Sequence, residues 1–133
     1  MSTRRLNIGI RTRVERESAL RTAFGRIRQG DLTPQEAGLY FESVEELRRV
    51  LTDKRLDVLL TITRRRPGSV RALANLLGRD YKNVNDDVAL LRQLGLVELE
   101  ARGGRGGAKT PVVPYDEIHV TINLRPVSAK RAA

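Results

Sequence analysis

The sequence predicts a mainly α-helical protein with a small β component, in the α+β class. Apolar residues recur at helical spacing in several segments between residues 12 and 94, whereas alternation of apolar and polar residues is confined to short segments. A chain of 133 residues with 40% hydrophobic content can build one modest core and a short extension. We therefore expect one compact domain that carries an appendage.

The chain is strongly basic. Its 25 Lys and Arg residues outnumber its 16 Asp and Glu residues, which gives a formal net charge of +9. This charge favours an anionic partner, and nucleic acid ranks ahead of an anionic membrane surface. No apolar segment approaches the roughly 20 residues that span a bilayer, and there is no cysteine for a disulfide or a thiolate zinc site. We expect a cytoplasmic protein without a membrane partner.

Two segments near the ends of the chain have the alternation of half-buried strands. Leu6, Ile8 and Ile10 alternate with polar or small residues in residues 5–11, and residues 118–124 repeat the pattern with "IHVTINL". A lone strand would leave an unpaired edge, so the two are expected to pair. The sequence leaves open whether they pair within one chain or across a dimer.

A basic amphipathic helix is expected over residues 12–29. Leu20, Phe24 and Ile27 recur at helical spacing in an arginine-rich stretch that ends at Gly30. Because exposed apolar stripes mark interaction sites, this one should pack against its own domain, a second copy or a protein partner.

Two short helices are expected next, because two capping patterns follow. In "TPQE", Thr33 can cap a helix, Pro34 suits its first position and Glu36 completes a capping box, and "SVEE" repeats the pattern with Ser43 and Glu46. A longer helix over residues 53–66 then stops at "RRRPG".

The clearest local pattern is a pair of helices joined by a tight turn. Ser69 can cap a helix that ends at Gly78, and Asp80 can cap the next one. In that second helix the spacing buries Tyr81, Val84, Val88 and Leu91 and turns Lys82, Asn83, Asn85, Asp86 and Ala89 outward, while Asp87, nearer the buried edge, contacts protein. This is the helix-turn-helix pattern, whose second helix enters the major groove of DNA. The alternative is an ordinary amphipathic helix with a solvated face.

A β-hairpin follows the second helix. Residues 94–100, "LGLVELE", lead into a strand, "ARGGRGGAKTP" forms a basic glycine loop, and "VVPY" at residues 112–115 returns. Such a hairpin is a wing, whose Arg102, Arg105 and Lys109 can reach phosphates or a minor groove. A merely solvated tip is the alternative.

Catalytic and metal sites have little support in the sequence. "GGRGGAKT" departs from the phosphate-binding loop at Ala108, and a lone His119 beside Glu117 and Asp116 is more often a solvated strand face than a metal ligand. No pairing of a nucleophile with a base is visible. We expect no enzyme activity, cofactor or metal.

Most of the chain resembles a family of prokaryotic winged-helix regulators, MarR-like in their DNA-binding part, many of them antitoxins of the TumA type. The resemblance is carried mainly by "LGRDYKNV" at residues 77–84 and by "PYDEI" at 114–118. Asn85 and Asp86 stand where that family tends to have histidine and arginine, which bears on base preference rather than on fold. The resemblance implies operator binding as a homodimer, with a small protein toxin as a further partner.

These observations combine into one prediction. Residues 1–50 form an N-terminal strand and helices for dimerisation or toxin binding, residues 51–125 a winged helix-turn-helix domain, and residues 126–133 a basic disordered tail. The protein is expected to be a sequence-specific regulator that binds double-stranded DNA and autoregulates its operon as an antitoxin. The alternatives are a free-standing transcription factor and an RNA-binding module. The predicted DNA contacts are Ser69, Arg71, Arg79, Tyr81, Lys82, Asn83, Asn85, Asp86, Arg102, Arg105 and Lys109, and the predicted partner contacts are Leu20, Phe24 and Ile27.

Overall fold

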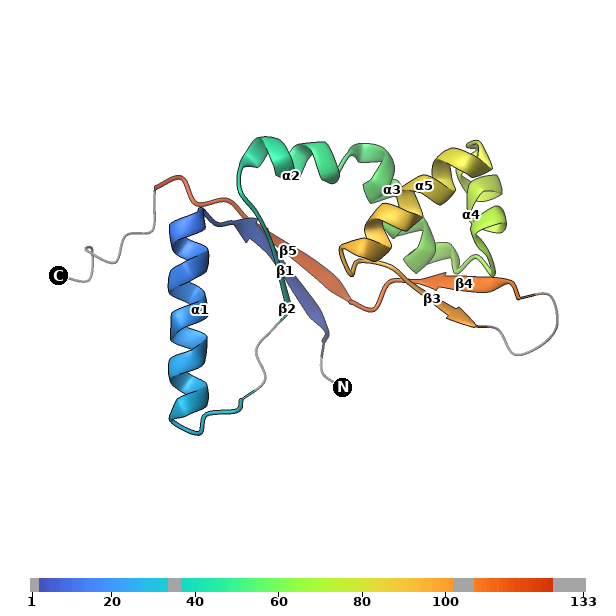
Figure 1. Ribbon diagram of the computed structural model, residues 1–133. Coiled ribbons are helices and arrows are strands. Elements are labelled where there is room, and N and C mark those ends of the chain that lie inside the picture. Colours follow the sequence, from blue (N-terminus) through green and yellow to red (C-terminus); the bar gives the residue numbers. More distant parts are fainter. Residues whose placement is uncertain (1–2, 34–36, 102–106, 126–133) are drawn as a thin grey trace. The chain divides into compact units, whose positions relative to one another are not determined.

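The computed structural model describes residues 3–33, 37–101 and 107–125, so the predicted tail at 126–133 lies outside the described residues. The described part contains five helices and five strands in two compact units (Figure 1). We call Val50–Asp116, with the chain through Arg4, the helical unit, and Arg5–Arg49, with the chain from Glu117 onward, the sheet unit. None of the helices in these ranges is both long and apolar enough to cross a lipid bilayer.

The sheet unit is built on a parallel three-stranded sheet. β1 (Arg5–Ile10) lies between β2 (Ala37–Phe41) and β5 (Glu117–Thr121), as Figure 1 shows. Leu6 and Ile8 of β1 are buried with Phe41 of β2 and Leu47 of α2 (Val44–Val50). The two terminal strands predicted from alternation therefore pair with each other, and they do so within one chain.

β2 corrects the prediction of a short helix after "TPQE". Residues 37–41 form a strand in register with Leu6–Ile10, while Pro34 and Glu36 lie outside the described residues. The segment "AGLYF" is too short to alternate clearly, so its partner decides its structure. Within this strand, Gly38 leaves room for the Tyr40 ring, because a Cβ at position 38 would lie 2.6 Å from that ring. The second capping pattern is confirmed, since the Ser43 hydroxyl accepts a hydrogen bond from the N–H of Glu46 at 3.1 Å.

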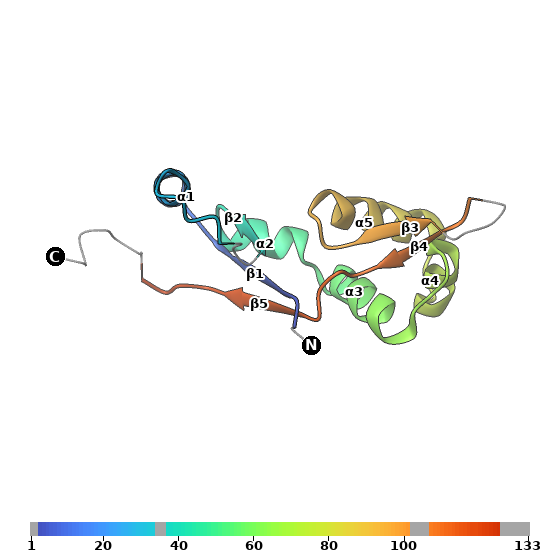
Figure 2. The same cartoon turned by 90° about the horizontal axis from the view of Figure 1, so that it is seen from below.

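α1 (Arg13–Arg28) confirms the predicted N-terminal helix. It begins where the Thr12 hydroxyl accepts a hydrogen bond from the N–H of Glu15. Figure 2 looks along its axis. None of its residues is buried, and Leu20, Phe24 and Ile27 are each more than half exposed. No element of the sheet unit covers the apolar stripe.

An ion pair joins neighbouring strands of the sheet. The Arg5 guanidinium on β1 donates to Glu117 on β5 at 2.7 Å, and His119 Nε2 lies 3.0 Å from the same carboxylate oxygen. The hydrogen bond from Arg5 lowers the pKa of Glu117 below its ordinary value. Glu117 thus contacts Arg5 and His119. The described residues contain no cluster of three acidic or histidine side chains suited to a metal.

The helical unit packs three helices against an antiparallel hairpin. α3 (Asp53–Arg65), α4 (Val70–Leu77) and α5 (Tyr81–Gln93) are followed by β3 (Glu98–Ala101) and β4 (Lys109–Val112), as Figures 1 and 2 show. Residues 117–125, grouped with this unit from the sequence, belong to the sheet unit. The buried side chains are Val58, Leu59, Ile62, Pro67, Leu73, Ala74, Val84, Val88, Leu91, Leu96, Val97 and Pro111.

Gly78 should be the glycine that matters most for the helical unit. Its φ of +63° ends α4 in the left-handed conformation, and a Cβ there would meet no neighbouring atom. Gly78→Ala should therefore destabilise the unit by about 1 kcal/mol through backbone strain alone. Gly78→Asn should cost less, because asparagine tolerates this conformation. Chemical denaturation followed by circular dichroism measures both, and an alanine variant no less stable than the asparagine variant would contradict this account.

Candidate functional site

The junction between α4 and α5 is fixed by local hydrogen bonds. The Ser69 hydroxyl accepts from the N–H of Ala72 at 3.0 Å and starts α4. Asp80 starts α5, because one of its carboxylate oxygens accepts from the N–H groups of Lys82 and Asn83. Only Gly78, Arg79 and Asp80 separate the two helices. The turn is therefore short and specified at both ends, which confirms the predicted caps.

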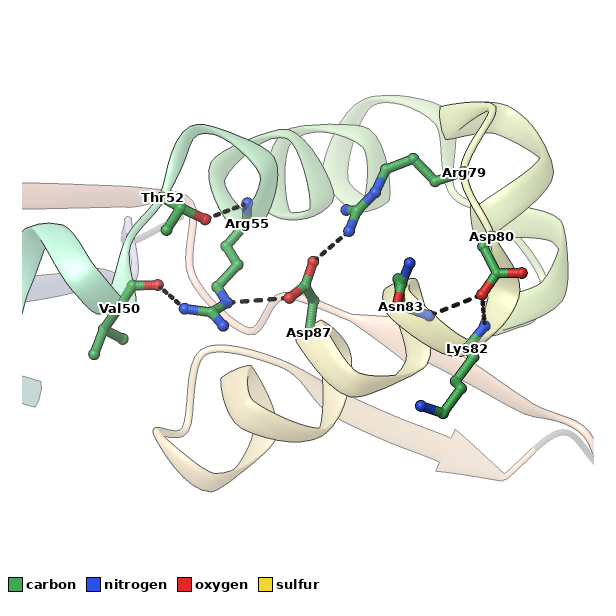
Figure 3. Close-up of polar contacts among 8 residues, drawn as sticks. All are labelled: Val50, Thr52, Arg55, Arg79, Asp80, Lys82, Asn83 and Asp87. Carbon is green, nitrogen blue, oxygen red and sulfur yellow. Dashed lines mark hydrogen bonds and ion pairs between the residues drawn. The ribbon is translucent and has the colours of Figure 1, made fainter.

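One carboxylate ties α5 to the rest of the helical unit. Asp87 accepts from Nε of Arg55 on α3 at 3.1 Å and from Nη2 of Arg79 in the turn at 2.8 Å (Figure 3). Arg55 also donates to the Val50 carbonyl at 2.8 Å. The side chains of Asp87, Arg79 and Arg55 are 14%, 20% and 23% exposed, so both pairs are largely shielded from water. This network fixes α5 against α3 and the turn.

One residue of this network differs from its predicted role, and another was not predicted at all. Arg79 was expected on the DNA-facing surface, but Asp87 holds one of its terminal nitrogens, and the other is buried without a hydrogen-bond partner among the described residues. Arg55 was missed because its acceptor lies 32 residues further along the chain. The available signal was Asp87 at the buried edge of α5, which required a cation from another element. That expectation for Asp87 is confirmed.

The outward side of α5 has a defined row of side chains, which we call the outer face: Lys82, Asn85, Asp86 and Ala89. All four are exposed, as the spacing predicts. Lys82, Asn85 and Ala89 follow one another at i, i+3 and i+7, so they project along one line of the helix. Asn83 is also exposed, but it lies one turn before Asp87 and therefore nearer the ion-pair network (Figure 3).

Tyr81 corrects the predicted buried stripe. Val84, Val88 and Leu91 are buried as expected, whereas Tyr81 is 38% exposed. The Arg71 guanidinium of α4 lies 4.3 Å from the centroid of the Tyr81 ring. This cation–π contact occupies the ring and fixes both side chains at the start of α5. The two predicted contacts therefore lie together, beside the outer face.

The hairpin carries the remaining predicted cations. β3 and β4 pair antiparallel from Glu98 opposite Val112 to Ala101 opposite Lys109, which confirms a hairpin after α5. The Thr110 hydroxyl donates to the Gly68 carbonyl at 3.0 Å and so ties β4 to the loop before α4. Lys109 is exposed, whereas Arg102 and Arg105 lie outside the described residues.

The chain belongs to the HVO_A0114 family, whose model matches residues 50–120, more than half of the sequence. That match contains the whole of Val50–Asp116 and ends within β5. Comparison with curated proteins gave no match, and comparison with solved structures gave none either.

Removal of the Asp87 charge should destabilise the helical unit. Asp87→Asn keeps the shape of the side chain but removes the negative charge on which Arg55 and Arg79 converge in a largely shielded site, which should cost about 2 to 4 kcal/mol. Asp86→Asn makes the same chemical change on the exposed neighbour and should stay within about 0.5 kcal/mol of the wild type. Urea unfolding measures both free energies, and equal values for the two variants would refute a structural role for the network.

Proposed function

We propose that the helical unit is a winged helix-turn-helix domain that binds double-stranded DNA, and that the protein is a sequence-specific transcriptional regulator. The observation that carries this proposal is the outer face of α5, which follows a tight turn and is held in one orientation by Asp87. In a helix-turn-helix protein the second helix contacts base edges with its N-terminal residues. Lys82 and Asn85 lie in the first half of α5.

The side chains of the outer face suit base edges. An asparagine amide can pair bidentately with adenine, and a lysine can donate to guanine or to a phosphate. Asp86 can accept from the amino group of cytosine, and Ala89 is small enough to let the helix approach the groove closely. Because Asn85 and Lys82 share one line of α5, a single docking of the helix can present both.

The hairpin supports the winged form of this motif. β3 and β4 follow α5 directly, and β4 is tied to the start of α4 through Thr110. Lys109 on β4 is exposed for a phosphate contact, and the sequence places Arg102 and Arg105 between the strands. Contacts of this kind supply affinity without reading sequence.

RNA binding is less well supported than duplex DNA binding. Sequence-specific RNA recognition depends on aromatic side chains on which unpaired bases stack. The chain has three Tyr and two Phe in all, and Arg71 already lies over the ring of Tyr81. A regulator that acts by occupying a duplex site needs no such platform.

An antitoxin role is a second candidate, favoured by the exposed stripe of Leu20, Phe24 and Ile27 on α1. DNA binding by the helical unit does not require this surface, so a small protein toxin could occupy it. Expression of the neighbouring gene alone tests this candidate. If expression of the neighbouring gene arrests growth and this protein relieves the arrest, the antitoxin role is supported. If the neighbouring gene is harmless, the free-standing regulator takes the place of the antitoxin.

Asn85→Ala should weaken binding to the specific DNA site more than binding to scrambled DNA. On a site selected from random duplexes, loss of one bidentate amide contact should cost about 1 to 3 kcal/mol and relax the preference at one base pair. Gln93→Ala removes another exposed amide, but at the last turn of α5, where little effect on the selected site is expected. Fluorescence anisotropy with selected and scrambled duplexes measures both, and an equal loss by Asn85→Ala on the two duplexes would refute base reading.

Lys109→Ala should weaken binding to all DNA sequences by the same factor. A cation that contacts only phosphate contributes through counterion release, so its loss should reduce the slope of log affinity against log salt by about one. Lys54→Ala, at the exposed start of α3, removes an equal charge away from the hairpin and should leave the slope nearly unchanged. If Lys109→Ala and the wild type give the same slope of log affinity against log salt, β4 does not contact the DNA.

A further inference from the structure

α1 presents an apolar stripe that none of the described residues of the sheet unit covers. Leu20, Phe24 and Ile27 follow one another at i, i+4 and i+7 and are 57%, 56% and 55% exposed. The residues of α1 that face the sheet are different ones. A cavity of about 690 Å³ beside β1 is lined by Val14, Glu15, Ser18, Ala19 and Arg21 of α1, and by none of the three stripe residues. The stripe therefore points away from its own sheet.

The helix itself needs a partner for its stability. α1 has 16 residues, none of them buried, and it contains Gly25 in its interior. In proteins, most of the stability of a helix comes from tertiary packing of its amphipathic face rather than from intrinsic helix propensity. Covering the stripe would stabilise α1, because it would remove the apolar surface of Leu20, Phe24 and Ile27 from water.

The charges beside the stripe indicate which partner covers it. Glu17 and Arg28 lie on the same flank of the stripe, eleven residues apart and near opposite ends of α1. When two identical helices pack antiparallel, equal flanks face each other and opposite ends meet. Glu17 of each copy then lies across from Arg28 of the other, and Leu20 lies across from Phe24.

A parallel pair would lack this complementarity. In a parallel pair, unlike flanks of the two helices face each other, so Glu17 and Arg28 of one copy would not lie across from Arg28 and Glu17 of the other. We propose that α1 pairs antiparallel with α1 of a second copy of this chain, through Leu20, Phe24 and Ile27, with Glu17 and Arg28 matched at the ends. This two-fold pairing uses the sheet unit alone and is independent of the proposed DNA binding.

The apolar part of the interface is tested by two matched substitutions in the full chain. Phe24→Asp places a charge in the stripe and should raise the dissociation constant of the dimer by at least about 30-fold, as for a central interface residue. Val14→Asp makes the same kind of change on the same helix, but at a position that is 71% exposed outside the stripe. It should leave the dimer intact. Sedimentation velocity without DNA measures the mass, and circular dichroism confirms that both variants stay folded.

The direction of the helices is tested by a charge exchange. Glu17→Arg and Arg28→Glu should each weaken the dimer several-fold, because each places like charges opposite one another in the two copies. The double variant restores opposite charges and should recover an affinity within about twofold of the wild type, although it reverses both local helix-dipole interactions and loses the ion pair between Arg13 and Glu17, which lie 3.5 Å apart. Failure of the double variant to recover would overturn the antiparallel arrangement.

Two further results would overturn the proposal as a whole. If the 133-residue chain is monomeric at micromolar concentration, a second copy does not cover the stripe. A dimer that Phe24→Asp leaves unchanged would place the interface elsewhere. Neither result bears on duplex binding by the helical unit, which is measured separately by anisotropy.

Discussion

The position of α5 depends on the carboxylate of Asp87. The core of the helical unit is apolar, and apolar packing tolerates shifts that a directional ion pair does not. Arg55 on α3 and Arg79 in the turn converge on Asp87 from two sides, so rotation of α5 about its own axis would break at least one pair. The same restraint that buries Val84, Val88 and Leu91 turns Lys82, Asn85 and Ala89 outward. Asp87 thereby determines which side chains of α5 face outward.

The parts of this structure that the sequence predicts well are those determined within a few residues. The caps at Ser43, Ser69 and Asp80 are confirmed, because each joins a side chain to an N–H only two or three positions away. Gly78 is confirmed for a similar reason, since its left-handed conformation is a property of one residue. The outer face of α5 follows from helical periodicity once the cap at Asp80 fixes where the helix starts. Local physics therefore gives most of the candidate site.

What the sequence does not reveal depends on distant partners. Strand alternation identifies β1 and β5 but carries no information on whether they run parallel, and β2 becomes a strand because β1 offers it an edge. Arg55 acquires its role only when folding brings α3 beside Asp87. Tyr81 has the spacing of a core residue, yet Arg71 from α4 holds its ring at the surface. In each case a contact between elements overrides or completes a local preference.

The two units also differ in how far each can sustain its own fold. Among the described residues, the helical unit buries side chains from all three of its helices and from its hairpin, whereas the sheet unit buries chiefly Leu6, Ile8, Phe41 and Leu47. A small core leaves a small margin of stability, so the sheet unit has more to gain from an added surface than the helical unit has. Pairing of α1 with a second copy would supply that surface where the apolar residues already lie. It would also place two helical units in one assembly, and two linked binding sites engage one duplex more tightly than either does alone. Stabilisation of the weaker unit and strengthening of DNA binding would then follow from the same contact.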